Sequence, residues 1–210
     1  MNITIRETTK KDNETIYQVE QRAFGEVDEA ELTKKLMADP PAEPLLSLLA
    51  FVEEEAVGHI LFTKATVTTE DSLSAMILAP LAVVPDYQKQ SIGGQLIKEG
   101  LRLLKEKHVD LVFVLGHIDY YPRHGFKPAL PLHFQAPYPI EKGKEEAWMV
   151  QALPADFPFE EYSGTVRCPM YLCGQNIGEN KFEPLISMRY KGFSLQISAN
   201  LSITIGNKPS

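Results

Sequence analysis

Hydrophobic and polar residues alternate at the start of the chain and then change to a helical spacing. The alternation predicts a short strand over residues 2–7. Apolar side chains three and four positions apart predict a helix over residues 10–24, with Thr9 as a candidate N-cap, and a second helix over 27–38. The proline-rich segment 39–44 ends this helical region, because proline lacks an amide N–H and clashes with the preceding turn.

Apolar segments rich in β-branched residues follow. Segments 45–53, 56–69 and 72–84 are joined by short polar turns, a spacing that predicts an antiparallel meander. A helix with one apolar stripe is predicted over residues 91–107, and the nearly continuous apolar run at 111–116 predicts a buried strand. This strand–helix–strand order indicates a parallel crossover connection.

The remainder of the chain divides into two parts. A helical turn at 119–123 and strands near 146–152 and 163–168 complete the predicted sheet, which makes the fold α/β. Residues 171–210 contain alternating segments with little charge. We therefore expect one domain over residues 1–170 and a C-terminal extension, of unassigned role, over 171–210.

Composition excludes several classes of function. Of 210 residues, 44% are hydrophobic and 23% are charged, as in ordinary globular proteins, and the formal net charge of -7 argues against broad nucleic-acid binding. No apolar run reaches the roughly 18 residues of a membrane span, and the N-terminus lacks the apolar core of a signal peptide. We expect a cytoplasmic protein. Cys168 and Cys173 lack a second Cys/His pair at metal-binding spacing, so we expect two reduced thiols and no metal site.

The stretch from Pro85 to Gly94 is the most informative part of the sequence. An apolar strand ends at a proline, a short polar turn follows, and a helix opens at paired glycines. Such a turn exposes backbone N–H groups at the positive end of a helix, where a pyrophosphate binds well. A dinucleotide-binding fold would need a Gly-x-Gly-x-x-Gly turn, and Gly93-Gly94 lacks that spacing.

Two motifs in this order resemble the GCN5-related N-acetyltransferase (GNAT) family. The segment Gln88-x-x-Ser91-x-Gly93 resembles the acetyl-CoA motif of the family, Arg/Gln-x-x-Gly-x-Gly/Ala, and residues 120–126 resemble its aromatic-Tyr-x-x-x-Gly-Phe segment. The resemblance covers roughly residues 1–170. Within the family the chain is most similar to the YhbS-like bacterial acetyltransferases, through the stretches Gly58–Phe62, Pro80–Val83 and Gly116–Tyr121.

This resemblance implies a fold and an activity. The fold would be a mixed α/β sheet of about six to seven strands with helices on both faces and a V-shaped splay between the fourth and fifth strands. The activity would be acetyl transfer from acetyl-CoA directly to a primary amine in a ternary complex, without a metal. Homodimers are common among such proteins. The acceptor would be a small-molecule amine or an amine of a peptide or protein; the sequence does not distinguish these, although a net acidic chain favours cationic amines.

The resemblance also implies roles for the residues around the glycine turn. The backbone of Leu81–Val83 would pair with the pantetheine arm as an added strand, and the N–H groups of residues 90–95 would hold the pyrophosphate. The implied CoA-binding residues are Leu81, Ala82, Val83, Gln88, Lys89, Gln90, Ser91, Ile92, Gly93, Gly94 and Gln95.

Ser91 departs from the family pattern, which has glycine at this position. If the backbone there needs a positive φ, serine costs roughly 1 kcal/mol or more. If the position needs only a small side chain, serine suffices and its hydroxyl could cap the helix. We expect weakened rather than abolished CoA binding. A non-catalytic acyl-CoA-binding or regulatory module is therefore the alternative to an active enzyme.

Tyr121 matches the tyrosine that protonates the leaving CoA thiolate in the family. A phenol with an ordinary pKa near 10 keeps its proton at neutral pH and can donate it. The alternative is that Tyr121 packs against Phe126 and has no chemical role. Its presence argues against a non-catalytic module.

The general base is less well defined. An ammonium substrate must lose a proton before attack, often through water to a carboxylate or a histidine. His117 and Glu26 are the candidates, with loop solvation as the alternative for His117. Glu20 and Glu26 are otherwise expected to be solvated surface carboxylates, and His59 is expected to be a core histidine with satisfied hydrogen bonds.

Overall fold

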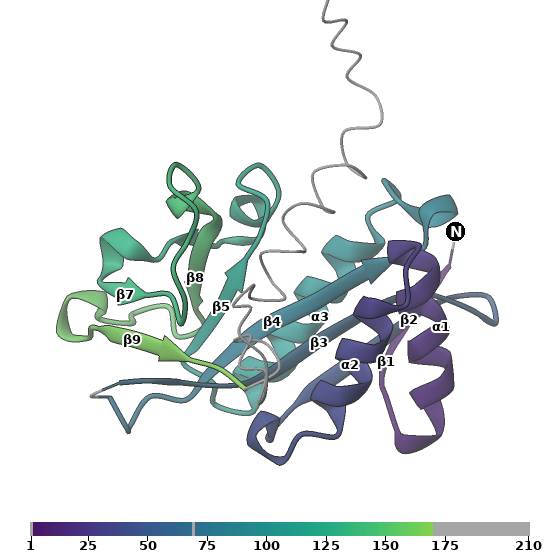
Figure 1. Cartoon of the computed structure of the whole chain (residues 1–210), viewed down its shortest axis with the longest axis horizontal. Helices are drawn as coiled ribbons and strands as arrows, with labels where there is room; N and C mark the ends of the chain where they lie inside the picture. Colours follow the sequence, from purple (N-terminus) through teal and green to yellow (C-terminus); the bar gives the residue numbers. More distant parts are fainter. Residues whose placement is uncertain (1, 69, 170–210) are drawn as a thin grey trace, which may run out of the picture.

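The computed structural model describes residues 2–68 and 70–169 as a mixed sheet between two layers of helices (Figure 1). The described strands are β1 (Ile3–Glu7), β2 (Leu46–Val52), β3 (Glu55–Val67), β4 (Ala75–Val83), β5 (Leu111–Leu115), β6 (Lys127–Pro128), β7 (Phe134–Gln135), β8 (Trp148–Ala152) and β9 (Gly164–Arg167). The α-helices of this part are α1 (Asn13–Phe24), α2 (Asp28–Met37) and α3 (Ile92–Glu106).

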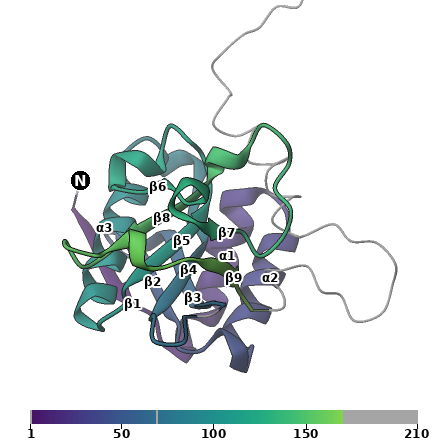
Figure 2. The ribbon, with the colours of Figure 1, turned by 90° about the vertical axis from the view of Figure 1, so that its left-hand side faces the viewer.

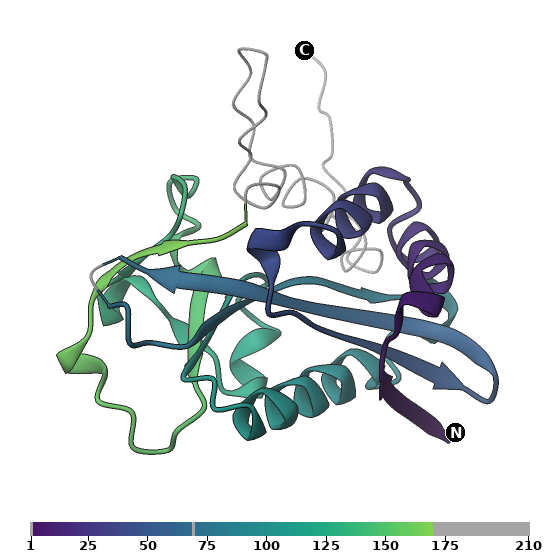
Figure 3. The same cartoon turned by 90° about the horizontal axis from the view of Figure 1, so that it is seen from below.

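Helices cover both faces of the sheet, as predicted. Helices α1 and α2 lie on one face and α3 lies on the other (Figures 2 and 3). Among the described residues the strand order is β1-β2-β3-β4-β5-β8-β6, with β7 and β9 off this path. The expected sheet of six to seven strands is confirmed in this main path. The two-residue strands β6 and β7 were not predicted, because so short a segment has no periodicity of its own.

The predicted antiparallel meander is confirmed. β3 pairs antiparallel with β2 on one side and with β4 on the other, and β1 adds to β2. The predicted helix at 10–24 is divided, however. Residues Lys10–Asp12 form a separate 3₁₀ turn that Thr9 caps in a capping box with Asp12, and α1 then begins at Asn13.

Strands β4 and β5 are parallel but diverge after three pairs. Ala75, Met76 and Ile77 pair with Leu111, Val112 and Phe113, and the pairing then stops although β4 continues to Val83. This is the expected splay between the fourth and fifth strands. Because β4 has no neighbour on that side beyond Ile77, its last residues present an open strand edge.

The core consists of apolar clusters on both faces of the sheet. Helix α3 lies so close to β3 that a Cβ on Gly100 would be 2.4 Å from a ring carbon of Phe62. Under the other face, Trp148 is fully buried, stacks on Phe113 and donates its indole N–H to the carbonyl of Phe134 (3.1 Å). These contacts fix the sheet that carries the splayed strands.

The C-terminal part gives one correction. Cys168 is disulfide-bonded, so the expectation of a reduced thiol is wrong for this residue. Cys173 and the predicted extension at 171–210 lie outside the described residues. Within the described residues, helices fall short of the length and apolar character that a membrane crossing requires.

Candidate active site

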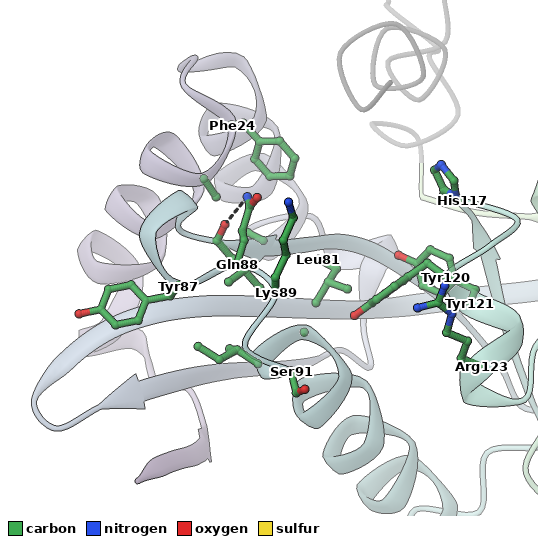
Figure 4. Close-up of a pocket in the computed structure, with 15 residues that line it drawn as sticks. Phe24, Leu81, Tyr87, Gln88, Lys89, Ser91, His117, Tyr120, Tyr121 and Arg123 are labelled. Atoms are coloured by element: carbon green, nitrogen blue, oxygen red, sulfur yellow. Dashed lines mark hydrogen bonds between the residues drawn. The ribbon is translucent and has the colours of Figure 1, made fainter. Parts of the chain in front are cut away.

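A cleft of about 490 Å³ opens where β4 leaves β5. Figure 4 shows Phe24 and Lys89 on one side of it and His117, Tyr120 and Tyr121 on the other. Its lining comes from α1, β4, the polar turn before α3, and the segment after β5. The lining residues are Ala23, Phe24, Leu81, Ala82, Val83, Tyr87, Gln88, Lys89, Ser91, Ile92, Gly93, His117, Tyr120, Tyr121 and Arg123.

The pairing of β4 with β3 determines which backbone groups face the splay. Val83 lies opposite Gly58, and the next N–H, of Val84, donates to the carbonyl of Val57 at 2.9 Å. Val83 and Gly58 are therefore a non-hydrogen-bonded pair, so the N–H and C=O of Val83 point away from β3. By alternation those of Leu81 also point into the splay, whereas those of Ala82 face β3.

The N-terminus of α3 presents the N–H groups that the sequence predicted. Within the described part of the chain, the N–H groups from Ser91 to Gly94 have no acceptor. That of Gln95 donates to the carbonyl of Ser91 (3.0 Å), so the open set ends one residue earlier than expected. Open N–H groups at a helix N-terminus are suited to a phosphate group.

Two side chains hold the turn before α3 in shape. Gln88 donates from its amide to the carbonyl of Val83 (3.0 Å), shown as the dashed line in Figure 4. Gln90 donates to the carbonyl of Asp86 (3.0 Å) and lines neither the cleft nor the adjoining cavity around the N-terminus of α3. Of the predicted CoA-binding residues, only Gln90 is absent from the cavity walls.

The backbone conformation of Ser91 decides between the two alternatives that the sequence left open. Its φ is +65°, in the left-handed region, and its hydroxyl makes no capping hydrogen bond. The backbone here needs a positive φ, so serine is strained and glycine would be favoured. Lys89 in the same turn also has a positive φ, of 60°.

Gly93 and Tyr120 fit together at this end of the helix. A Cβ on Gly93 would lie 2.7 Å from the hydroxyl oxygen of Tyr120, so a larger residue would displace that side chain. Burial raises the pKa of Tyr120 and keeps its hydroxyl protonated. Tyr120 is a cleft residue that was not predicted, although its position beside Tyr121 in the motif was the available signal.

Tyr121 is both packed and part of the cleft wall. Its ring meets Phe126 edge to face, with centroids 5.6 Å apart, and its side chain is 4% exposed. It lies over Gly116 so closely that a Cβ there would be 2.0 Å from a ring carbon. Tyr121 therefore does pack against Phe126, and this packing holds its ring at the cleft.

The two base candidates are placed differently. His117 lines the cleft, and its Nδ1 accepts from the N–H of Asp119 (3.3 Å) and lies 3.8 Å from an Asp119 carboxylate oxygen. Glu26 is exposed in the turn between α1 and α2 and is absent from the cleft wall.

Glu20 and His59 lie together beneath the cleft. Both side chains are fully buried, and a carboxylate oxygen of Glu20 contacts Nδ1 of His59. Nε2 of His59 is 2.9 Å from the hydroxyl of Ser47. The expectation of a core histidine with satisfied hydrogen bonds is confirmed for His59. The expectation of a surface carboxylate is wrong for Glu20, which is buried against His59. The helical pattern alone did not show this buried partner.

A second cavity, of about 710 Å³, continues around the N-terminus of α3. It shares Ser91, Tyr120 and Arg123 with the cleft and adds Gly94, Gln95, Ile97, Lys98, Leu101, His124, Gly125 and Gln151. Burial, with the nearby charge of Arg123, lowers the pKa of His124. His124 therefore remains neutral beside the helix end at neutral pH.

The charges in the cleft wall are all of one sign. Among its described lining residues there is no carboxylate, and Lys89 and Arg123 carry positive charge. Neither of these two forms an ion pair within the described residues. The described residues also contain no group of acidic, histidine or cysteine side chains arranged to hold a metal.

Comparison with known proteins identifies the family. The family described as "Acetyltransferase (GNAT) domain" matches residues 4–129, more than half of the chain. The chain belongs to the GNAT acetyltransferase family. The match spans β1 through the glycine turn and the Tyr121 motif, so it includes the whole cleft.

Relatives of this GNAT chain support the narrower placement. The uncharacterised N-acetyltransferase YjhQ of Escherichia coli K12 is 48% identical over 80% of this chain and 92% of its own length. The crystal structure of YhbS from Escherichia coli with CoA is 30% identical, with a TM-score of 0.73 over 83% of this chain and 94% of that one. A GNAT acetyltransferase of Brucella melitensis with acetyl-CoA is 27% identical, with a TM-score of 0.63 over 81% and 97%. The predicted similarity to the YhbS-like group is confirmed.

Proposed function

We propose that this GNAT protein transfers the acetyl group of acetyl-CoA directly to a primary amine in a ternary complex. One observation carries the proposal. The open edge of β4, the free N–H groups of α3 and the Tyr121 side chain meet at one cleft. The relatives whose structures were determined with CoA and acetyl-CoA support this choice of acyl donor. The expected cytoplasmic location and homodimer remain predictions.

Backbone groups of the splay and the helix end would bind the donor. The backbone of Leu81 and Val83 would pair with the amides of the pantetheine arm, which takes the place of the missing strand. The N–H groups from Ser91 to Gly94 would receive the pyrophosphate, with Lys89 and Arg123 near enough in the wall to balance its charge. Ala82 would contribute its small side chain rather than its backbone.

Tyr121 and His117 would move the protons. The amine nitrogen forms a bond to the thioester carbonyl carbon, the carbon–sulfur bond breaks, and Tyr121 gives its proton to the thiolate. His117 would accept the amine proton at Nε2 once Nδ1 carries a hydrogen. In the structure Nδ1 accepts from the Asp119 N–H (3.3 Å), which leaves the hydrogen on Nε2. His117 would therefore have to give up this bond and carry its hydrogen on Nδ1, 3.8 Å from an Asp119 carboxylate oxygen, before Nε2 could act as the base.

The cleft also indicates the class of acceptor. Its wall offers aromatic and apolar groups, including Phe24 and Leu81, together with positive charge and no carboxylate among the described residues. The described wall offers no carboxylate to pair with a second positive charge on the acceptor. We therefore infer a monoamine with an apolar body, which narrows the cationic amines that the net charge of the chain favoured to those with a single charge.

Binding and turnover measured together test the proposal. Acetyl-CoA should raise the melting temperature, and free thiol should be released with monoamines such as phenethylamine faster than with polyamines such as spermidine. Tyr121→Phe keeps the ring and its packing but removes the proton, so kcat should fall at least tenfold while the Kd for CoA stays within about twofold.

The possible results separate the hypotheses. Full kcat in Tyr121→Phe would show that the acid assignment is wrong. Faster turnover of spermidine would overturn the acceptor class alone. Stabilisation by acetyl-CoA without thiol release from any amine would favour the non-catalytic module. No stabilisation at millimolar CoA would refute both.

A further inference from the structure

A buried polar network joins α1 to the centre of the sheet, and the proposed chemistry does not use it. Glu20 of α1 contacts Nδ1 of His59 on β3, whose Nε2 is within hydrogen-bond distance of Ser47 on β2. Glu20 and His59 are 0% exposed and Ser47 is 4% exposed. The network resembles a catalytic triad in composition, but its serine is closed off from substrate.

The network lies directly behind the cleft. His59 is the cross-strand partner of Ala82, so both side chains project from the same face of the sheet, toward α1. Glu20 precedes Ala23 and Phe24 by about one helical turn, and these two residues form the α1 side of the cleft wall. The position of this wall therefore depends on how α1 is seated on the sheet.

A carboxylate is an unusual residue at the contact between α1 and the sheet. The surrounding cluster is apolar, with Ile16, Val19 and Leu49, and a well-packed apolar pair could fill the same space. A buried, hydrogen-bonded polar pair contributes little net stability relative to such an apolar pair, but its geometry is directional. Glu20 and His59 thus fix the rotation of α1 about its own axis and its distance from the sheet. Apolar contacts are interchangeable and would fix both less strictly.

A second carboxylate ties the same helix from the solvent side. Glu55 accepts from Arg22 of α1 at 2.6 Å and from the hydroxyl of Tyr87 at 2.8 Å, and Tyr87 also lines the cleft. These groups are exposed, so this tie is weak by itself. Its presence shows that the last turn of α1 is connected to the donor side of the cleft as well as to the sheet.

We propose that Glu20 and His59 are positioning residues that set the α1 wall of the acceptor site. They act through Ala23 and Phe24 and do not touch substrate. The proposal rests on the proposed function, in which Phe24 belongs to the apolar wall that selects the acceptor. It predicts that breaking the pair affects the amine more than the CoA, whose contacts lie on β4 and α3.

Glu20→Gln is the informative variant. Glutamine keeps the length of the side chain and an oxygen for the Nδ1–H of His59, but replaces the second carboxyl oxygen by an NH2 group. We expect the acceptor KM to rise at least tenfold, with kcat within about threefold and the Kd for CoA within about twofold. Glu14→Gln makes the same chemical change on the exposed side of α1 and should leave all three constants unchanged.

Amide hydrogen exchange provides a readout that does not need turnover. In Glu20→Gln, exchange in the last turn of α1 should be at least tenfold faster, while exchange in α3 should match the wild type. If the wild type acetylates no amine, the proposed function fails, and the exchange rates still test the seating of α1. If Glu20→Gln does not fold, the double variant Glu20→Met/His59→Leu replaces the pair by apolar side chains and should fold while still showing the raised acceptor KM.

Three results would overturn the proposal. One is an acceptor KM in Glu20→Gln equal to that of the wild type. Another is a parallel loss of CoA affinity, which would indicate general damage to the fold. The third is a folded double variant with a wild-type acceptor KM and wild-type exchange in α1, which would show that apolar packing seats the helix equally well.

Discussion

Replacement of Ser91 by glycine should stabilise this protein without tightening CoA binding. Ser91 has a φ of +65° at the N-cap of α3, and its hydroxyl forms no capping bond that the substitution would remove. A left-handed backbone costs an L-residue about 1–2 kcal/mol, and glycine avoids this cost. Glycine in turn loses about 0.5–1 kcal/mol more conformational freedom on folding. The difference leaves a net gain of about 0.5–1 kcal/mol.

The expected gain can be measured by thermal and denaturant unfolding. For a domain of this size, 1 kcal/mol corresponds to a rise of about 2–4 °C in Tm. Ser91→Ala is the matched control, because alanine keeps the backbone strain and removes only a hydroxyl that caps nothing; it should stay within about 0.5 kcal/mol of the wild type. Lys89→Gly, at a φ of 60° in the same turn, should give a gain similar to that of Ser91→Gly.

The affinity for CoA shows whether the strain at Ser91 is a cost of folding or a cost of binding CoA. The left-handed conformation of Ser91 belongs to the N-cap of α3, so we assign its energy to the folding free energy and not to CoA binding. The Kd for CoA in Ser91→Gly should therefore stay within about threefold of the wild-type value, as measured by calorimetry. A tenfold gain in affinity without a change in Tm would refute this reasoning and show that the turn rearranges when CoA binds.

Two further predictions concern contacts elsewhere in the domain. Gly116→Ala places a Cβ 2.0 Å from the Tyr121 ring, so kcat should fall more than tenfold and stability by about 1–3 kcal/mol, measured by thiol release and denaturant unfolding. Arg6→Gln removes the hydrogen bonds that hold the pKa of Asp12 well below its usual range. Because that folded-state pKa is lowered, the pair stabilises the protein above about pH 4 and its contribution is lost as the pH falls. Arg6→Gln should lose about 0.5–1 kcal/mol at pH 7 and converge with the wild type in acid; an equal loss at both pH values would contradict the assignment.

Local patterns predicted most of the elements and part of the cleft lining. The meander, the α3 helix and the parallel β5 strand follow from the periodicity of apolar residues, since each element buries its own apolar face. The motif around Ser91 and Gly93 indicated the helix N-terminus for the same local reason. The two-residue strands β6 and β7 could not be predicted, because only their partners in the folded chain make them strands.

Side-chain environment was harder to predict than position. Glu20 is four residues from both Ile16 and Phe24, so its spacing places it on the apolar face of the helix, but nothing within that helix shows that a histidine 39 residues later lies against it. Glu26, which the sequence offered as a base, is instead exposed and away from the cleft wall. Tyr120 was overlooked because its role depends on its approach to Gly93.

The sequence by itself determined that this chain forms a GNAT fold with a phosphate-binding turn, because periodicity and short motifs are properties of neighbouring residues. Only the tertiary structure decided that Leu81 and Val83 turn their backbone groups into the splay, that Ser91 is strained, and that Glu20 pairs with His59. Strand register, backbone torsion and burial arise when distant segments pack together. They are consequences of the whole fold and leave no local signal in the sequence.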